Sequence, residues 1–183
     1  VLPDENKKYG GVRLMWKTGQ SLMKLKMKEI RSILGGEVSG HMFVGEDYYG
    51  FDDAPLVALK TLEILSRTKK TVSEVFEEIP KLAATPEIIL SAPDDLKFGI
   101  IDEIGEVFAR DYELVTVDGV RAAFEDGWGL VRASNAQPAI TLRFEAYTRE
   151  KLVEYMLRFK EQLNKYPQVD QGPLDKQISN FSS

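Results

Sequence analysis

Apolar residues recur at helical spacing near the start of the chain. Those that share one face are separated by four, three and four positions: Met23, Met27, Ile30 and Leu34. This spacing predicts a helix over 20–34 that buries one face in a core. The glycine pair at 35–36 predicts the end of that helix.

A short strand and two further helices are predicted in the rest of the first eighty residues. The apolar run at 41–44 indicates a buried strand. An aspartate followed by a proline predicts one helix start, and a threonine followed by a glutamate predicts another, because such side chains cap free backbone amides. These residues are Asp53 with Pro55, and Thr71 with Glu74. We expect the two helices to end near Ser66 and Ile79.

Beyond residue 86 the pattern changes to a run of strands bracketed by two helices. Strands are predicted at 87–92, 112–117, 120–124, 128–134 and 139–146, and helices at 94–110 and after Thr148. Two Asp-Gly pairs, at 118–119 and 126–127, predict tight turns between strands. The order of elements predicts an α+β layer, a sheet with helices on one face.

Small residues and prolines separate the two patterns. The segment KLAATP indicates a boundary, so we expect one domain over 1–80, a linker at 81–85 and a second domain over 86–166. The polar stretch 167–183 shows no periodicity and predicts a disordered tail.

Composition excludes several kinds of chemistry. The 183 residues include no cysteine and one histidine, which rules out disulfides and thiolate sites and argues against zinc. The net charge of -5 argues against nucleic acid as the partner of the whole chain. No apolar run approaches the length of a bilayer span and no signal-peptide pattern is visible, so we expect a cytoplasmic protein without a membrane partner. The polar start without methionine predicts a longer parent chain.

The segment RASNAQP places an oxyanion-binding set between two strands. Arg132, Ser134 and Asn135 combine a five-donor guanidinium with a hydroxyl and an amide. An ordinary turn is the alternative, with the short polar side chains capping their own backbone and the arginine paired with a carboxylate. Arg143 on the next strand is a further candidate for an anionic substrate, and its alternative partner is Glu145.

The segment GGEVSGH holds the single histidine among glycines. Glu37, Ser39 and His41 can donate and accept hydrogen bonds to several hydroxyls, which suits a sugar, while glycines allow close approach of the backbone. A structural connection between helix and strand, with a structural histidine, is the alternative.

Taken together, these segments resemble a known enzyme family. GGEVSGHMF with YYGFDDA behind it, and GWGLVRASNAQPAITLRFEA further on, resemble the C-terminal half of the α-D-phosphohexomutases, in particular the phosphomannomutase/phosphoglucomutase branch. The resemblance runs in order from Trp16 to Leu163.

The resemblance implies a fold and a division of the site. It implies a partial three-layer α/β third domain, followed by a fourth domain with an antiparallel sheet similar to half of a TATA-binding protein. The third domain would recognise sugar hydroxyls through Glu37, Ser39 and His41. The fourth would hold the idle phosphate of a phosphorylated hexose through Arg132, Ser134 and Asn135, positions that match the family's phosphate loop.

The resemblance also implies a reaction that this chain cannot complete alone. A phosphoserine on the first domain would exchange phosphoryl groups with hexose 1- and 6-phosphates through a bisphosphate, assisted by magnesium held on the second domain. Neither the serine loop nor the metal loop is present here, so we expect the chain alone to be inactive and to bind no metal. Its partner would be those N-terminal domains.

Two positions depart from the family pattern. Gln20 stands where many relatives have histidine, so it can hydrogen-bond substrate but cannot transfer a proton near neutral pH. Ala136 replaces a threonine of the phosphate loop, which leaves its backbone amide as a donor. His41 would then be the remaining proton relay or a substrate contact.

Two alternatives to a mutase half stay open. One is a free-standing phosphosugar-binding or regulatory module without catalysis. The other is a nucleic-acid binder, which the acidic charge balance disfavours. An incomplete third domain would expose a sheet edge, which favours self-association. The preference among glucose, mannose and glucosamine phosphates is not encoded in these motifs.

Overall fold

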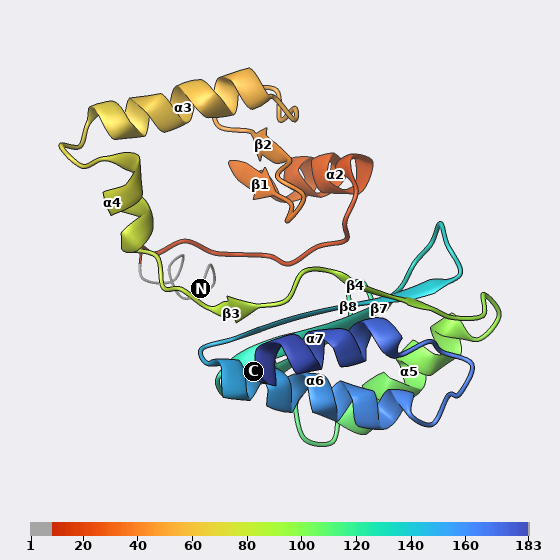
Figure 1. Ribbon diagram of the computed structural model, residues 1–183. Helices are drawn as coiled ribbons and strands as arrows, with labels where there is room; N and C mark the ends of the chain where they lie inside the picture. Colours follow the sequence, from red (N-terminus) through yellow and green to blue (C-terminus); the bar gives the residue numbers. More distant parts are fainter. Residues whose placement is uncertain (1–8, 183) are drawn as a thin grey trace. The chain divides into compact units, whose positions relative to one another are not determined.

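The computed structural model describes residues 9–182 and divides the chain into two compact units at Pro80 and Lys81 (Figure 1). We call residues 9–80 unit 1 and residues 81–182 unit 2. The polar start of the chain, at 1–8, lies outside the described residues. Among the described helices, none is long and apolar enough to cross a bilayer. The cytoplasmic location stays a prediction.

Unit 1 combines a small antiparallel sheet with three helices. In chain order its elements are α2 (Gln20–Ile30), β1 (Leu34–Gly36), β2 (Met42–Val44), α3 (Ala54–Ser66) and α4 (Val72–Glu77). β1 and β2 pair in antiparallel register, with Gly35 opposite Phe43. Its buried apolar side chains are Met27, Phe43 and Val44. The strand predicted from the apolar run at 41–44 is confirmed as β2.

The two predicted helix caps of unit 1 are confirmed. Asp53 Oδ1 accepts the amide of Leu56 at 3.0 Å, and Thr71 and Glu74 form the reciprocal capping box. Tyr48 donates its hydroxyl to the other oxygen of Asp53 at 2.6 Å. That hydrogen bond, followed by the Leu56 amide, lowers the pKa of Asp53. The caps depend on neighbours in sequence, which is why the sequence reveals them.

The first predicted helix is too long. α2 ends at Ile30, because Arg31 adopts a left-handed conformation with φ 55° and donates its amide to Met27 O. Leu34 therefore begins strand β1 and is exposed, and the predicted apolar face is buried only at Met27. The glycine at 35 does not end the helix. A Cβ at that position of β1 would stand 2.7 Å from Met27 Sδ, so glycine there leaves room for the buried Met27 side chain.

Unit 2 is an antiparallel sheet covered by helices. Its strands are β3 (Ala83–Ala84), β4 (Ile88–Ser91), β5 (Glu113–Val115), β6 (Val120–Phe124), β7 (Gly127–Ala133) and β8 (Ala139–Ala146). Its helices are α5 (Lys97–Phe108), α6 (Arg149–Leu163) and α7 (Gly172–Ser182). The strand order is β3-β8-β7-β6-β5, and β4 pairs with the same edge of β8 as β3. The predicted order of strands and helices is confirmed.

All three helices lie on one face of this sheet, as Figure 1 shows for α5, α6 and α7. Ile140, Leu142 and Phe144 of β8 point to that face and are buried. The alternating residues Thr141 and Arg143 point to the other face. The predicted layer of a sheet with helices on one side is therefore confirmed, and the other face is left for polar side chains.

The predicted linker is wrong over most of its length. Residues 83–84 form β3, with Ala83 opposite Ala146 and Ala84 opposite Glu145. Thr85 is buried, and its Oγ1 accepts the amide of Phe144 at 3.1 Å. Small side chains make this segment resemble a linker in sequence. They also allow it to lie flat along the edge of β8, so it belongs to unit 2.

The predicted disordered tail is a helix. α7 covers residues 172–182, and Leu174, Ile178 and Phe181 follow at spacings of four and three toward the core of unit 2. Leu174 is fully buried. Tyr166, just before this stretch, donates its hydroxyl to Glu103, and burial followed by this contact raises its pKa to about 12. Three apolar residues in a polar stretch are therefore enough to hold α7 against the core of unit 2.

Candidate functional site

The predicted sugar-recognition residues of unit 1 lie on the five-residue connection between β1 and β2. We call it the 37–41 loop. The loop closes on itself, because the Glu37 amide donates to His41 O at 2.9 Å and the Gly40 amide donates to Glu37 O at 3.0 Å. Gly40 has φ 95°, a conformation that favours glycine. The short strands thus present Glu37, Ser39 and His41 from a single turn.

Glu37 connects this loop to the start of helix α2. Its Oε1 accepts the amide of Gly19 at 2.8 Å, and its Oε2 accepts the Ser39 hydroxyl at 3.3 Å. Gly19, the N-cap residue of α2, has no side chain to serve as cap. A carboxylate there satisfies a free amide and interacts favourably with the helix dipole. Each carboxylate oxygen still has a second lone pair for a substrate hydroxyl.

His41 pairs with a carboxylate that the sequence analysis did not include. Its Nδ1 lies 2.5 Å from Asp52 Oδ2, and Gln20 Nε2 donates to the same oxygen at 3.3 Å. The Met42 amide donates to Asp52 Oδ1 at 3.3 Å. Because a carboxylate only accepts, the proton of the neutral imidazole belongs on Nδ1, and Nε2 is left as an acceptor. The structure thus brings Gln20, Glu37, Ser39 and His41 together.

Asp52 is the residue that sequence reasoning missed. The stretch FDDAP holds two adjacent aspartates, and only Asp53 caps helix α3. Asp52 instead forms a backbone bridge with Phe43, which brings its side chain beside the 37–41 loop. The signal available in the sequence was that a single helix start needs one cap, so the second aspartate required another explanation.

Arg132 of unit 2 points to the sheet face without helices, where its guanidinium contacts strand β8 and two connecting segments. Nε donates to Thr141 Oγ1 on β8 at 3.2 Å, Nη1 to Asp118 at 3.4 Å and Nη2 to Glu87 at 3.5 Å. Exposed carboxylate pairs at such distances contribute little free energy. The hydroxyl of Thr141 therefore orients the guanidinium, while its two terminal nitrogens keep weak, replaceable partners.

The loop between β7 and β8, which we call the 134–138 loop, is held by its own serine. Ser134 Oγ accepts the amides of Ala136 at 3.3 Å and Gln137 at 3.1 Å. This is the turn geometry that the sequence analysis kept as the alternative. The Ala136 amide, expected to be an available donor, is therefore already bonded. Asn135 and Ala136 are exposed at the tip of the loop.

Arg143 lies on the same sheet face as Arg132, one strand over. It stands opposite Leu130 in the β7–β8 register, while Arg132 stands opposite Thr141. Arg143 Nη2 lies 3.6 Å from Glu145, the alternative partner expected from the sequence. Its Nε is buried without a hydrogen-bond partner. Unit 2 thus groups its two predicted arginines on one face, with the 134–138 loop at one end of the strands.

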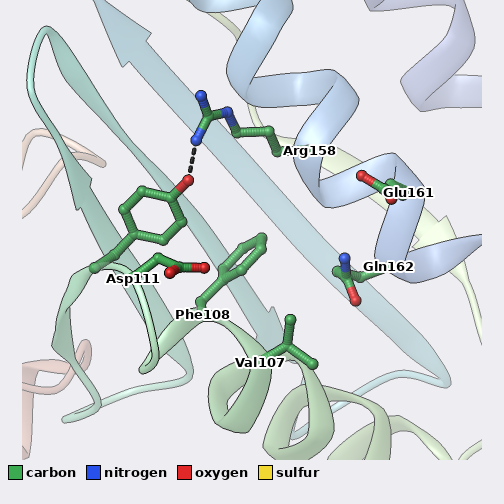
Figure 2. A pocket seen from close by; sticks show the side chains of 7 residues that line it. Val107, Phe108, Asp111, Arg158, Glu161 and Gln162 are labelled. Atoms are coloured by element: carbon green, nitrogen blue, oxygen red, sulfur yellow. Dashed lines mark hydrogen bonds between the residues drawn. The ribbon is translucent and has the colours of Figure 1, made fainter.

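Two surface hollows lie away from these residues. One, of about 650 Å³, is lined in unit 1 by Gly45, Asp47, Tyr48 and Tyr49. The other, of about 310 Å³, lies between α5 and α6 and is lined by Val107, Phe108, Asp111, Tyr112, Arg158, Glu161 and Gln162 (Figure 2). Arg158 donates to the Tyr112 hydroxyl, and the dashed line at Arg158 in Figure 2 marks this hydrogen bond. Arg158 also pairs with Glu154, so its donors already have partners within unit 2.

Metal ligands do not gather in the described part of the chain. Within residues 9–182, no three His, Asp or Glu side chains are arranged to hold a metal ion. The side chains of the two loops can hydrogen-bond to hydroxyls and pair with an anion, and His41 Nε2 can accept a proton.

Comparison with known proteins matches the two loops to two different domains of one protein family. The family model for the phosphoglucomutase/phosphomannomutase alpha/beta/alpha domain III matches residues 1–82, and the model for the C-terminal domain of the same proteins matches residues 67–162. The chain belongs to the phosphoglucomutase/phosphomannomutase family. The family resemblance and the fold class expected from the sequence are confirmed.

Individual relatives agree with this membership. A phosphomannomutase/phosphoglucomutase of Pseudomonas putida is 46% identical over 156 residues, which cover 85% of this chain and 34% of the relative. A phosphoglucomutase of Neisseria gonorrhoeae is 39% identical over 166 residues, covering 89% and 36%. A crystal structure of a phosphoglucomutase/phosphomannomutase family protein from Burkholderia thailandensis matches with a TM-score of 0.78 and 36% identity, over 90% of this chain and 35% of that one. The chain thus spans about a third of the length of these relatives.

Proposed function

We propose that this chain is the substrate-recognition half of a phosphohexomutase that interconverts hexose 6-phosphate and hexose 1-phosphate. The observation that carries the proposal is the pair of loops: a hydroxyl-binding set at 37–41 and an arginine-anchored turn at 134–138, in family domains III and IV. The complete enzyme would supply a phosphoserine, and magnesium held on another domain would assist transfer. Relatives about three times as long support this proposal over a free-standing binding module.

Unit 2 would bind the phosphate that does not react. Arg132 is oriented by Thr141, and its two carboxylate contacts are long and partly exposed. A phosphate accepts a bidentate, charge-assisted pair from a guanidinium, so it would replace the contacts to Asp118 and Glu87. Arg143, with an unpartnered Nε and a 3.6 Å contact to Glu145, would add a second positive charge on the same face. Asn135 at the exposed tip would donate to a remaining oxygen.

Unit 1 would hold the sugar and handle its proton. Glu37 keeps acceptor capacity and Ser39 carries a hydroxyl on the same turn, so they suit hexose hydroxyls in either of two orientations. The hydroxyl that attacks the phosphoserine must lose a proton, and His41 Nε2 is the acceptor that Asp52 leaves available. We assign Asp52 the role of orienting His41, with Gln20 as its second partner.

The proposal is tested by replacing the anchor of the phosphate. In the complete enzyme, Arg132→Ala should weaken the binding of glucose 1-phosphate by about 2 kcal/mol or more, because a charge-assisted pair is lost. Isothermal titration calorimetry measures this directly. Arg110→Ala, which removes an exposed arginine just after α5, is the matched control and should leave binding unchanged. Equal affinities of Arg132→Ala and the unaltered enzyme would reject the assignment.

A further inference from the structure

Lys97 is a buried charge at an unfavourable place. It is the first residue of helix α5, and it is 3% exposed. Lysine is almost never fully buried unless its ammonium is paired. The start of a helix also carries the positive end of its dipole, which disfavours a cation. The ammonium at this position therefore depends on partners outside the helix.

The contacts of Lys97 lead to the 134–138 loop. Its Nζ donates to Gln137 O at 2.9 Å, forty residues along the chain, and to Asp94 Oδ1 at 2.5 Å. The Asp94 side chain is 74% exposed, so water screens that ion pair. The contact to the Gln137 carbonyl joins the first turn of α5 to the loop between β7 and β8.

The Gln137 carbonyl accepts two hydrogen bonds. Gln137 O also accepts the amide of Ala139 at 2.8 Å, while the Gln137 amide donates to Ser134 Oγ. The neighbouring Pro138 has no amide hydrogen, and its carbonyl accepts the amide of Ala92 at 3.0 Å. The ammonium therefore holds the carbonyl of the same residue whose amide is bonded to Ser134. Without it, the loop would lose this hydrogen bond to α5.

We propose that Lys97 is a positioning residue for the phosphate-binding loop. Its ammonium holds the Gln137 carbonyl in place, and the Gln137 amide is bonded to Ser134. The lysine thereby fixes the positions of Asn135 and of Arg132, near the end of β7, relative to a bound phosphate. The inference rests on the proposed function of that loop.

Lys97→Met tests this inference in the complete enzyme, because methionine keeps the apolar stem and removes the charge and donors. The dissociation constant for glucose 1-phosphate should rise about tenfold, since a small displacement of a binding group is costly. The KM should rise with it while kcat changes little. Lys97→Arg, which keeps a cation at a contact with a single carbonyl, should return the dissociation constant to within about threefold of the original.

Two controls separate positioning from stability. Lys165→Met removes an exposed lysine with a comparable contact three residues back, to Gln162, and should leave the dissociation constant unchanged. Asp94→Asn removes the ion pair and keeps the Gln137 contact, so binding should again be unchanged. If Lys97→Met does not fold, Lys97→Gln, a neutral and shorter donor, should give a weakened affinity in the same measurement.

The outcomes distinguish this inference from the proposed function. A lower melting temperature for Lys97→Met with unchanged dissociation constant and KM would mean that the lysine only stabilises α5, and the inference fails. If Arg132→Ala loses binding while Lys97→Met and Lys97→Gln do not, the loop binds phosphate and Lys97 does not position it. If Arg132→Ala keeps full binding, the proposed function fails and this inference fails with it.

Discussion

The two recognition loops are built on different foundations. The 134–138 loop joins β7 and β8, which pair over seven positions and lie on a continuous buried core. The 37–41 loop joins strands that pair over three positions, in a unit whose buried apolar side chains are Met27, Phe43 and Val44 among the described residues. Unit 2 thus holds its loop by sheet and core, whereas unit 1 holds its loop by polar side chains.

The difference matches what each ligand group needs. A phosphate is a compact anion that benefits from a rigid arginine and a fixed turn. A hexose that binds in two orientations needs partners that can both donate and accept, and such partners are Glu37, Ser39 and His41. Polar contacts at the surface are individually weak, so the unit 1 loop is easier to rearrange.

The largest expected effect is on the unit 2 core. Phe159 of α6 is fully buried against Phe108 and Phe144, with ring centroids 4.7 Å and 5.1 Å away. Gly129 of β7 leaves room for the ring, since a Cβ there would lie 2.5 Å from it. Phe159→Ala should therefore lower the free energy of unfolding of unit 2 by about 3–5 kcal/mol, because the neighbouring rings cannot collapse into the cavity.

Hydrogen exchange of the full chain, followed by mass spectrometry, reads the two units separately. Peptides from 88–163 should lose protection in Phe159→Ala, while peptides from 20–77 keep theirs. Leu157→Ala on the outer face of the same helix is the matched control, and its change should stay within about 0.5 kcal/mol. A loss of protection spread equally over both units would show that they do not have separate cores.

The contrast between the units also explains which elements could be predicted. The caps at Asp53, Thr71 and Thr148 are local, so a few adjacent residues determine them. The strands of unit 2 show alternation because one face is buried against helices. Predictions were wrong where residues distant in sequence determine the structure. β3 forms because it pairs with the edge of β8. α7 forms because Leu174 is buried in the core of unit 2.

In the candidate site, too, features that are local in sequence could be predicted and those that depend on distant residues could not. The residues of both loops could be named from two motifs, because each loop is contiguous in sequence. The roles of Asp52 and Lys97 could not be predicted from a motif. Asp52 contacts His41, eleven residues away in sequence, and Lys97 contacts Gln137, forty residues away. The end of α2 at Arg31 escaped prediction for a different reason. A left-handed arginine carries no local signal comparable to glycine.

A smaller effect is expected when the polar framework of unit 1 is altered. Asp52→Asn keeps size and shape but offers an amide hydrogen to His41 Nδ1, which would favour the wrong imidazole tautomer. We expect kcat of the complete enzyme to fall about a hundredfold, with hydrogen exchange of unit 1 almost unchanged. Steady-state kinetics with glucose 1-phosphate measures the change.

The matched control for this variant lies five residues away. Asp47 has φ 51° on an exposed turn, a conformation that asparagine accepts readily, so Asp47→Asn should retain full activity. Unchanged turnover in Asp52→Asn would mean that the aspartate only ties Met42 and Gln20 together. The polar contacts of unit 1 would then stabilise its fold without a role in turnover. Only the loop of unit 2 would then have a framework tied to its proposed role.

The smallest of these effects tests where unit 2 begins. Thr85 is buried, donates its amide to Phe144 O at 3.0 Å and accepts the Phe144 amide on Oγ1 at 3.1 Å. Thr85→Val keeps the shape but leaves the Phe144 amide without its acceptor, which should lower the free energy of unfolding of unit 2 by about 1–3 kcal/mol. Thr85→Ser keeps the hydroxyl and should restore most of that loss. If valine has no effect on exchange of the Phe144 amide, the Thr85 hydroxyl does not stabilise this edge of β8. If Thr85→Val lowers the free energy of unfolding and Thr85→Ser does not, then β3 and Thr85 stabilise the sheet edge of β8, the strand that follows the 134–138 loop.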